Sequence, residues 1–221
     1  MMRLQKAFQI LKPMSKKPNY QKQLDDLLPQ IDSASKRPTL LLHACCGPCS
    51  SYVLEYLSSH FDITVLFYNP NIYPQEEYER RLDELLNFYK RFVPAQNVRV
   101  IQTPYEPEEF YNAVGTRENP ELAKEPERGE RCHRCYELRL RYTYDYACAN
   151  NFDYFCTTLS ISPFKYAYMI NEIGSDLPEL VEGPRWLHSD FKKKNGFKRS
   201  LELSSEYNLY RQEYCGCIYS I

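Results

Sequence analysis

Short apolar runs alternate with amphipathic stretches along the sequence from residue 39 onward. The apolar runs are rich in β-branched and aromatic residues, which predicts strands at 39–44, 62–69, 97–105 and 152–160. The stretches between and after them place apolar residues at helical spacing, which predicts helices at 50–60, 75–92, 106–114, 135–151 and 165–174, and a final helix at 204–217. This order predicts an α/β fold, a Rossmann-like parallel sheet with helices on both faces.

The first 37 residues differ from the rest and are predicted to form a basic N-terminal extension, with residues 38–221 as a single domain. The extension is polar and contains three prolines, and a short helix is predicted around 19–28. Residues 1–38 hold eight Lys and Arg against three Asp, a net charge of +5, whereas the rest of the chain carries −6. A basic arm on an acidic body suits contact with a polyanion, although a solvated tail explains the same charge.

Apolar stretches are too short to suggest membrane insertion or secretion. None approaches the roughly 20 residues that cross a bilayer, and the N-terminus lacks the apolar run of about 7–15 residues found in signal peptides. We therefore predict a cytoplasmic protein. In a reducing cytosol, its nine cysteines are expected to be metal ligands or redox groups rather than a disulfide framework.

Three cysteines lie within five residues, in the sequence HACCGPCS at 43–50. Cys45, Cys46 and Cys49 follow the first predicted strand and open the first predicted helix. Ligands of open parallel sheets bind beyond the carboxyl ends of the strands, so this turn falls where a site is expected. The absence of a G-x-G-x-x-G or G-x-x-x-x-G-K-[ST] motif argues against a dinucleotide or nucleoside triphosphate at this turn.

Two further cysteine pairs follow at short spacing. Cys132 and Cys135 form a C-x-x-C motif at the start of a predicted helix, whose N-terminus stabilises thiolates. Cys215 and Cys217 flank the flexible Gly216, and so close a pair forms only a strained, readily reduced disulfide. This third pair is therefore better suited to storing two electrons than to holding a fold together.

The first two clusters together can supply the four thiolates of a [4Fe–4S] cluster or of a four-cysteine zinc site. The three clusters hold seven thiols, more than one tetrahedral ion can use, which favours a redox metal centre over structural zinc or inert buried thiols. Cys148 and Cys156 have no partner at motif spacing and are predicted to be small buried hydrophobes.

Five motifs extend this pattern, and they occur in the order LLLHACCGPCS, YNPNIYPQEEYERR, RCHRCYELRL, TTLSISPFK and YRQEYCGCIYS. Together they resemble the QueH-type epoxyqueuosine reductases over roughly residues 38–221. The resemblance implies a fold similar to the adenine-nucleotide hydrolases (HUP-like) and the reduction of epoxyqueuosine to queuosine at the wobble position of tRNA. The implied partners are a tRNA with a GUN anticodon and an electron donor that the sequence does not identify, with no membrane involved.

The same resemblance assigns roles to the cysteines. It implies a [4Fe–4S] cluster, with a further iron nearby, and the matching cluster ligands are Cys45, Cys46, Cys132 and Cys135. Cys49 is either a ligand of the additional iron or its neighbour. Cys215 and Cys217 match the pair taken to be redox-active.

Conversion of an epoxide to an alkene needs two electrons and the loss of oxygen as water, so a proton donor is also required. His43, Tyr73 and Asp190 are candidates, and each has an ordinary structural role available.

Contact with RNA would involve basic and aromatic side chains. The run at 191–200 holds five positive charges and no negative one. It is either a phosphate contact or a solvated loop. Tyr142 and Tyr146 share a helical face, where packing is the more frequent role, and residues 68–74 would border the pocket. Two rival functions remain: a zinc-stabilised RNA-binding module without catalysis, and a metal-free thiol–disulfide oxidoreductase.

Overall fold

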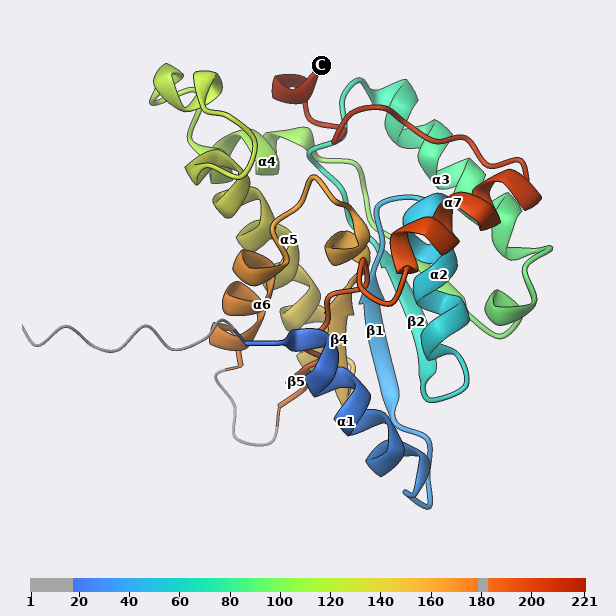
Figure 1. Cartoon of the computed structure of the whole chain (residues 1–221). Coiled ribbons are helices and arrows are strands. Elements are labelled where there is room, and N and C mark those ends of the chain that lie inside the picture. Colours follow the sequence, from blue (N-terminus) through green and yellow to red (C-terminus); the bar gives the residue numbers. More distant parts are fainter. Residues whose placement is uncertain (1–17, 179–182) are drawn as a thin grey trace, which may run out of the picture.

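Five parallel strands form one sheet in the order β3-β2-β1-β4-β5, as Figure 1 shows. The computed structural model describes residues 18–178 and 183–221. The strands are β1 (Thr39–His43), β2 (Asp62–Phe67), β3 (Arg99–Gln102), β4 (Tyr154–Thr157) and β5 (Arg185–Trp186). The predicted α/β class and parallel sheet are confirmed, and so are the four predicted strands.

The central strand β1 is buried on both faces of the sheet. Leu40 and Leu42 pack into the core on one face, whereas Leu41 packs into a second core on the other. The register pairs Leu42 with Val65 of β2 and with Cys156 of β4. Burial on both faces explains why the strands read as continuous apolar runs rather than as alternating patterns.

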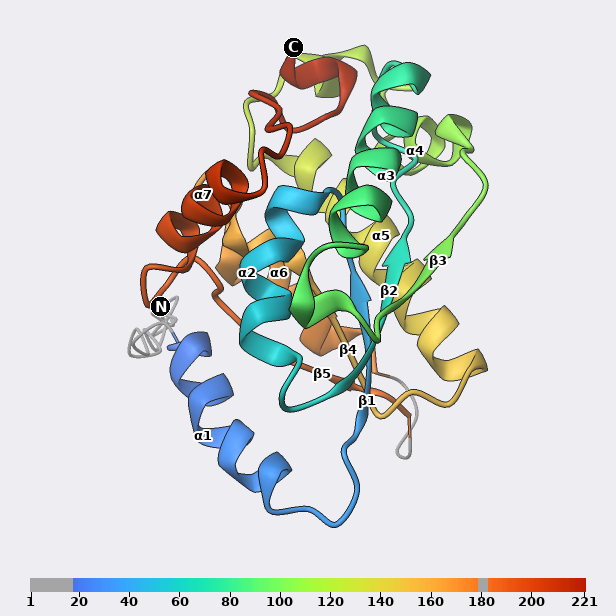
Figure 2. The same ribbon diagram turned by 90° about the vertical axis from the view of Figure 1, so that its right-hand side faces the viewer.

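The helices cover the two faces of the sheet in separate groups (Figures 1 and 2). Their bounds are α1 (Tyr20–Asp32), α2 (Gly47–Leu57), α3 (Gln75–Tyr89), α4 (Pro107–Val114), α5 (Glu130–Ala149), α6 (Ala167–Asp176) and α7 (Gly196–Glu206). Helices α1, α2, α3 and α7 contribute to the core on one face, and α5 and α6 to the core on the other. Helix α4 packs against α5.

The predicted helix around 19–28 is confirmed as α1. Leu24, Leu28 and Ile31 on α1 are buried in the same core as the apolar residues of α2 and α3. The remainder of the predicted basic extension, residues 1–17, lies outside the described residues. The domain boundary between residues 37 and 38 stays a prediction.

Two helix predictions are wrong in ways that the packing explains. Gly174 does not end α6, which continues to Asp176; instead this glycine leaves room for the Trp186 ring, which a Cβ atom would overlap. The helix predicted at 204–217 begins and ends earlier, as α7. Residues 207–217 follow an irregular path, and Asn208, with φ of 51°, cannot continue a helix.

Among the described residues, no helix combines the length and the apolar character needed to cross a membrane.

Candidate metal and redox site

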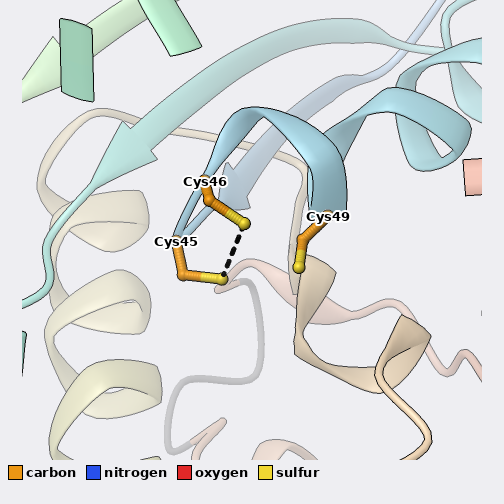
Figure 3. Close-up of side chains that lie close together, drawn as sticks. All are labelled: Cys45, Cys46 and Cys49. Atoms are coloured by element: carbon orange, nitrogen blue, oxygen red, sulfur yellow. Dashed lines mark hydrogen bonds between the residues drawn. The ribbon is translucent and has the colours of Figure 1, made fainter. Parts of the chain in front are cut away.

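The turn between β1 and α2 brings three cysteine sulfurs together, as Figure 3 shows. The Sγ atoms of Cys45, Cys46 and Cys49 all lie within 4.8 Å of one another, and those of Cys45 and Cys46 are 3.8 Å apart. Cys46 is the N-cap of α2 and has extended backbone angles, which turns its side chain toward that of Cys45. Within residues 18–178 and 183–221, this is the one group of three or more potential metal ligands.

The sheet topology explains why a site forms at this turn. The chain passes from β1 outward through β2 to β3, whereas β4 and β5 lie on the opposite side of β1. Strand order therefore reverses between β1 and β4, and the loops that follow these two strands separate at the carboxyl edge. The three cysteines occupy the β1 side of this opening.

Of the three cysteines at this turn, Cys45 is the one whose thiolate form is stabilised. Hydrogen bonds with the Cys46 and Cys49 thiols, together with the charge of Arg139, hold the pKa of Cys45 well below its usual range. The hydrogen bond with Cys45 raises the pKa of Cys46 to about 12. The Cys46 sulfur also accepts a hydrogen bond from Gln212 Nε2 at 3.3 Å.

Cys132 and Cys135 lie in the first turns of α5, as the sequence predicts, but they do not join the group of three sulfurs within the described residues. Cys135 is buried in a small apolar cluster that contains Cys217, Phe110 and Val114. Burial raises the pKa of both Cys132 and Cys135. The charge of Cys215 also raises the pKa of each of these two thiols, which indicates that the third cysteine pair lies near them.

The third pair lies in a tight turn of the C-terminal segment, which crosses above the carboxyl edge of the sheet (Figure 1). Gly216 has φ of 116°, and a Cβ atom there would lie 2.7 Å from Arg81 Nη1, so both backbone and space require glycine. The Tyr73 amide donates to the Gly216 carbonyl at 2.8 Å, and Arg81 Nη1 donates to the Cys215 carbonyl at 3.3 Å. These bonds fix the turn, and both cysteines are free thiols.

The sequence analysis missed Lys165, which contacts the third pair directly. Its Nζ atom donates a hydrogen bond to Cys215 Sγ at 2.7 Å. The Cys217 hydrogen bond and the Lys165 ammonium hold the pKa of Cys215 well below its usual range, whereas the hydrogen bond with Cys215 raises the pKa of Cys217. The only available signal was the position of Lys165 at the end of the motif TTLSISPFK.

Arg139 is a buried cation that lies among all three cysteine segments. Burial lowers its pKa, but the sulfurs of Cys135, Cys215 and Cys45 raise it by more. Arg139 Nη1 donates to Asn69 Oδ1 at 3.4 Å, and its Nε and Nη2 atoms have no hydrogen-bond partner in the part of the chain that the structure describes.

A buried guanidinium without a carboxylate is costly unless negative charge faces it. Several thiolates around a metal centre supply such charge. The surroundings of these cysteines therefore fit a bound anionic metal–thiolate group.

A cavity of about 240 Å³ opens onto these residues. Cys45, Cys49, Cys215 and Lys165 line it, together with Tyr214. The cavity therefore brings the first cysteine segment, the third cysteine segment and a cation to one small space. A ligand in it would contact both thiol groups and an ammonium.

The three candidate proton donors do not line this cavity. His43 is buried between Thr157 and the Tyr68 carbonyl, and burial lowers its pKa to about 3, so it is neutral near pH 7. Asp190 pairs with Lys192 at 2.6 Å, and Tyr73 is 41% exposed. These placements favour structural roles.

The remaining aromatic and cysteine predictions concern packing. The Tyr142 ring stacks on Tyr68 with 3.8 Å between centroids, and Tyr146 packs against the core on the same face of the sheet. Cys156 is fully buried as predicted, and Cys148 is half-buried against that core.

Comparison with known proteins places this arrangement in a family. A family model described as "Epoxyqueuosine reductase QueH" matches residues 40–221. A protein of that name from Staphylococcus aureus (strain Mu50) is 41% identical over 213 residues, which cover 96% of this chain and 87% of the relative. The chain belongs to the QueH family. The QueH match spans β1 to the C-terminus and so includes all three cysteine segments.

Two other proteins described as QueH show similar coverage. The Streptococcus pyogenes protein is 41% identical over 93% of this chain and 79% of its own length. The Thermotoga maritima protein is 34% identical over 83% of this chain and 90% of its own length.

Proposed function

We propose that this chain is an epoxyqueuosine reductase that converts epoxyqueuosine to queuosine at the wobble position of tRNA with a GUN anticodon. The single observation that supports it best, beside membership of the QueH family, is the cavity in which Cys45, Cys49 and the Lys165–Cys215 pair meet. A reductase of a polar substrate needs a group that stores electrons and a group that delivers protons in one space. This cavity offers both. The reaction belongs in the cytoplasm, where tRNA and reduced thiols coexist.

A [4Fe–4S] cluster is proposed on Cys45, Cys46, Cys132 and Cys135, with Cys49 beside it as a ligand of an additional iron. The support is chemical: the sulfurs of Cys45 and Cys135 lie near the buried Arg139, whose Nε and Nη2 atoms have no hydrogen-bond partner among the described residues. When bound, the cluster supplies single electrons and the additional iron supplies a Lewis acid for oxygen.

Cys215 and Cys217 are proposed as the two-electron store. The net reaction balances as one epoxide plus two thiols giving one alkene, one water and one disulfide. Oxidation of the two thiols to the disulfide supplies the two electrons, and the epoxide oxygen leaves as water with two protons. An external electron donor then returns the disulfide to two thiols.

The described contacts support an assignment of the protons in this proposed reaction. Cys215 is the thiolate, because Cys217 and Lys165 both stabilise its negative charge. Cys217 keeps its proton, since the hydrogen bond with Cys215 raises its pKa. The Cys217 thiol and the Lys165 ammonium together hold the two protons that water formation requires. Lys165 thus replaces the donor candidates predicted from the sequence.

The test of the function is anaerobic reconstitution with iron and sulfide, followed by incubation with epoxyqueuosine-containing tRNA and a chemical reductant. Mass spectrometry of the nucleosides should show the loss of one oxygen atom. Reconstituted protein should be brown, with broad absorption near roughly 400 nm from sulfide-to-iron charge transfer.

The two rival functions give different results in the same experiment. A colourless protein that holds one zinc ion and leaves the nucleoside unchanged would support a zinc-stabilised RNA-binding module. A metal-free oxidoreductase would lose turnover in Cys215→Ser but keep it in Cys132→Ser. The reductase proposed here loses turnover in both.

A further inference from the structure

A second, larger hollow adjoins the cysteine cavity. It has a volume of about 700 Å³, and Pro163 and Lys165 line both spaces. Its other walls come from the start of α1, from Arg128 and from residues 190–194 before α7. Figures 1 and 2 both show the start of α1 beside the chain that leads into α7. We call this hollow the basic groove.

Positive charge dominates the basic groove, although the whole chain has a net charge of −1. Its lining contains two carboxylates, Asp25 and Asp190, and six cations: Lys22, Arg128, Lys165, Lys192, Lys193 and Lys194. The local net charge is therefore +4. Such a local excess on a near-neutral protein fits a polyanionic ligand.

Carboxylates pair with three of these cations, one of which is Lys22 with Asp26 at 2.6 Å, and leave the others available. Lys192 pairs with Asp190 at 2.6 Å and Lys194 with Asp25 at 3.1 Å, while Lys193 has an exposed side chain without a carboxylate partner among the described residues. The Lys194 pair is largely exposed to solvent, and such pairs contribute little to stability. A phosphate can therefore replace Asp25 at Lys194 at small cost.

Aromatic side chains also line the basic groove. Tyr20, Tyr166 and Tyr168 face it, and ring contacts join Tyr168 to both of the others, at 6.2 Å and 5.8 Å between centroids. Single-stranded RNA is bound by this combination, in which cations follow the phosphates and aromatic rings support unpaired bases. An acidic peptide would use the cations but has no need of the tyrosines.

We propose that the basic groove binds the single-stranded anticodon loop next to the nucleotide that enters the cysteine cavity. This inference rests on the proposed function and deepens it. The start of α1, the described part of the predicted basic extension, forms one wall, and Lys192–Lys194 of the predicted basic run form the other. The shared wall at Pro163 and Lys165 lets the loop backbone stay in the groove while one nucleotide turns inward.

Binding of a synthetic anticodon stem-loop to the reconstituted protein tests the inference, with fluorescence anisotropy measured at several salt concentrations. The variant is Lys193→Ala/Lys194→Ala, and the matched control is Lys198→Ala, from the same basic run but outside the groove. Each lost contact to a single strand lowers the salt slope by about 0.7, which at 0.15 M salt is a loss of about fourfold per contact. The double variant should therefore bind about 15-fold more weakly, and the control should bind as wild type does.

Equal affinity and equal salt slope in the double variant and the wild type would overturn the inference. Turnover separates it from the proposed function. A wild-type protein that binds RNA through the groove but forms no queuosine refutes the reductase and supports the groove. An active double variant with the wild-type KM for RNA overturns the groove and leaves the reductase standing. A double variant that binds RNA normally, and loses turnover with a protein reductant but not with dithionite, would assign the groove to an acidic electron donor instead.

Discussion

Replacement of Lys165 by Met should suppress the reactivity of Cys215. Met is close to Lys in length and shape, so the change mainly removes the ammonium that lies 2.7 Å from Cys215 Sγ. A hydrogen bond to a charged group is worth about 1.5–3 kcal/mol. At about 1.4 kcal/mol per tenfold change, the thiolate population at neutral pH falls on the order of 10- to 100-fold.

The observable change is smaller than the change in population. A thiolate of higher pKa is intrinsically more nucleophilic, with a Brønsted coefficient of about 0.4–0.5. About half of the loss is therefore recovered on a logarithmic scale. The reaction of Cys215 with a small disulfide reagent should slow by about 3- to 10-fold at pH 7 in Lys165→Met.

The assay is anaerobic labelling of the reconstituted protein, with the rate at Cys215 followed by peptide mass spectrometry. Lys165→Arg keeps a cation and should retain most of the rate. Lys22→Met, which removes an exposed lysine paired with Asp26, should react as wild type does. A wild-type labelling rate in a folded Lys165→Met protein would refute the role given to this lysine.

Three further perturbations test other parts of the structure. Cys132→Ser should lose bound iron and the absorption near roughly 400 nm. Cys215→Ser should keep both and lose turnover. Equal loss of iron in the two variants would contradict the proposed roles of these cysteines. Gly174→Ala should lower the free energy of unfolding by about 1–3 kcal/mol in denaturant titrations, because the new Cβ overlaps the Trp186 ring. The control is Gly47→Ala, whose Cβ would lie 3.6 Å from the Leu85 backbone and which should change the free energy of unfolding by less than about 1 kcal/mol. A chelator should remove iron from Arg139→Met faster than from wild type, because the variant lacks the buried cation that faces the cysteine sulfurs. An unchanged rate of iron loss would show that Arg139 does not face the metal centre.

Local patterns were sufficient to predict most of the fold. Four of the five described strands and most helices follow from the spacing of apolar residues, and the cysteine turn after β1 follows from its position between a strand and a helix. The segment at 207–217 was predicted wrongly because its path depends on distant contacts. The Tyr210 amide donates to Glu84 of α3 at 2.8 Å, and the Arg80 guanidinium lies over the Tyr210 ring. No local pattern encodes such contacts.

The same reason explains which site residues were missed. Cys45 and Cys132 belong to motifs with short internal spacing, so each was visible in the sequence. Lys165 acts on Cys215, fifty positions further along the chain, and apart from its place at the end of TTLSISPFK nothing near Lys165 distinguishes it from a surface lysine. Gly174 is similar, because glycine is a frequent residue at helix C-caps and only the position of Trp186 reveals that this one has a packing role.

Charge links this site to the stability of the surrounding fold. Arg81 is buried with Glu77 as its ion-pair partner at 2.6 Å, whereas the buried Arg139 has no carboxylate partner among the described residues. An uncompensated buried charge costs several kcal/mol, and the thiolates of Cys45 and Cys215, whose pKa values are low, supply negative charge that faces Arg139. Neutralising those thiolates would destabilise the same edge that holds the C-terminal turn and its cysteine pair. The negative charge at the cysteines is therefore part of what positions Cys215 and Cys217 over the cavity, and binding of an anionic metal centre should stabilise the redox pair as well as supply electrons.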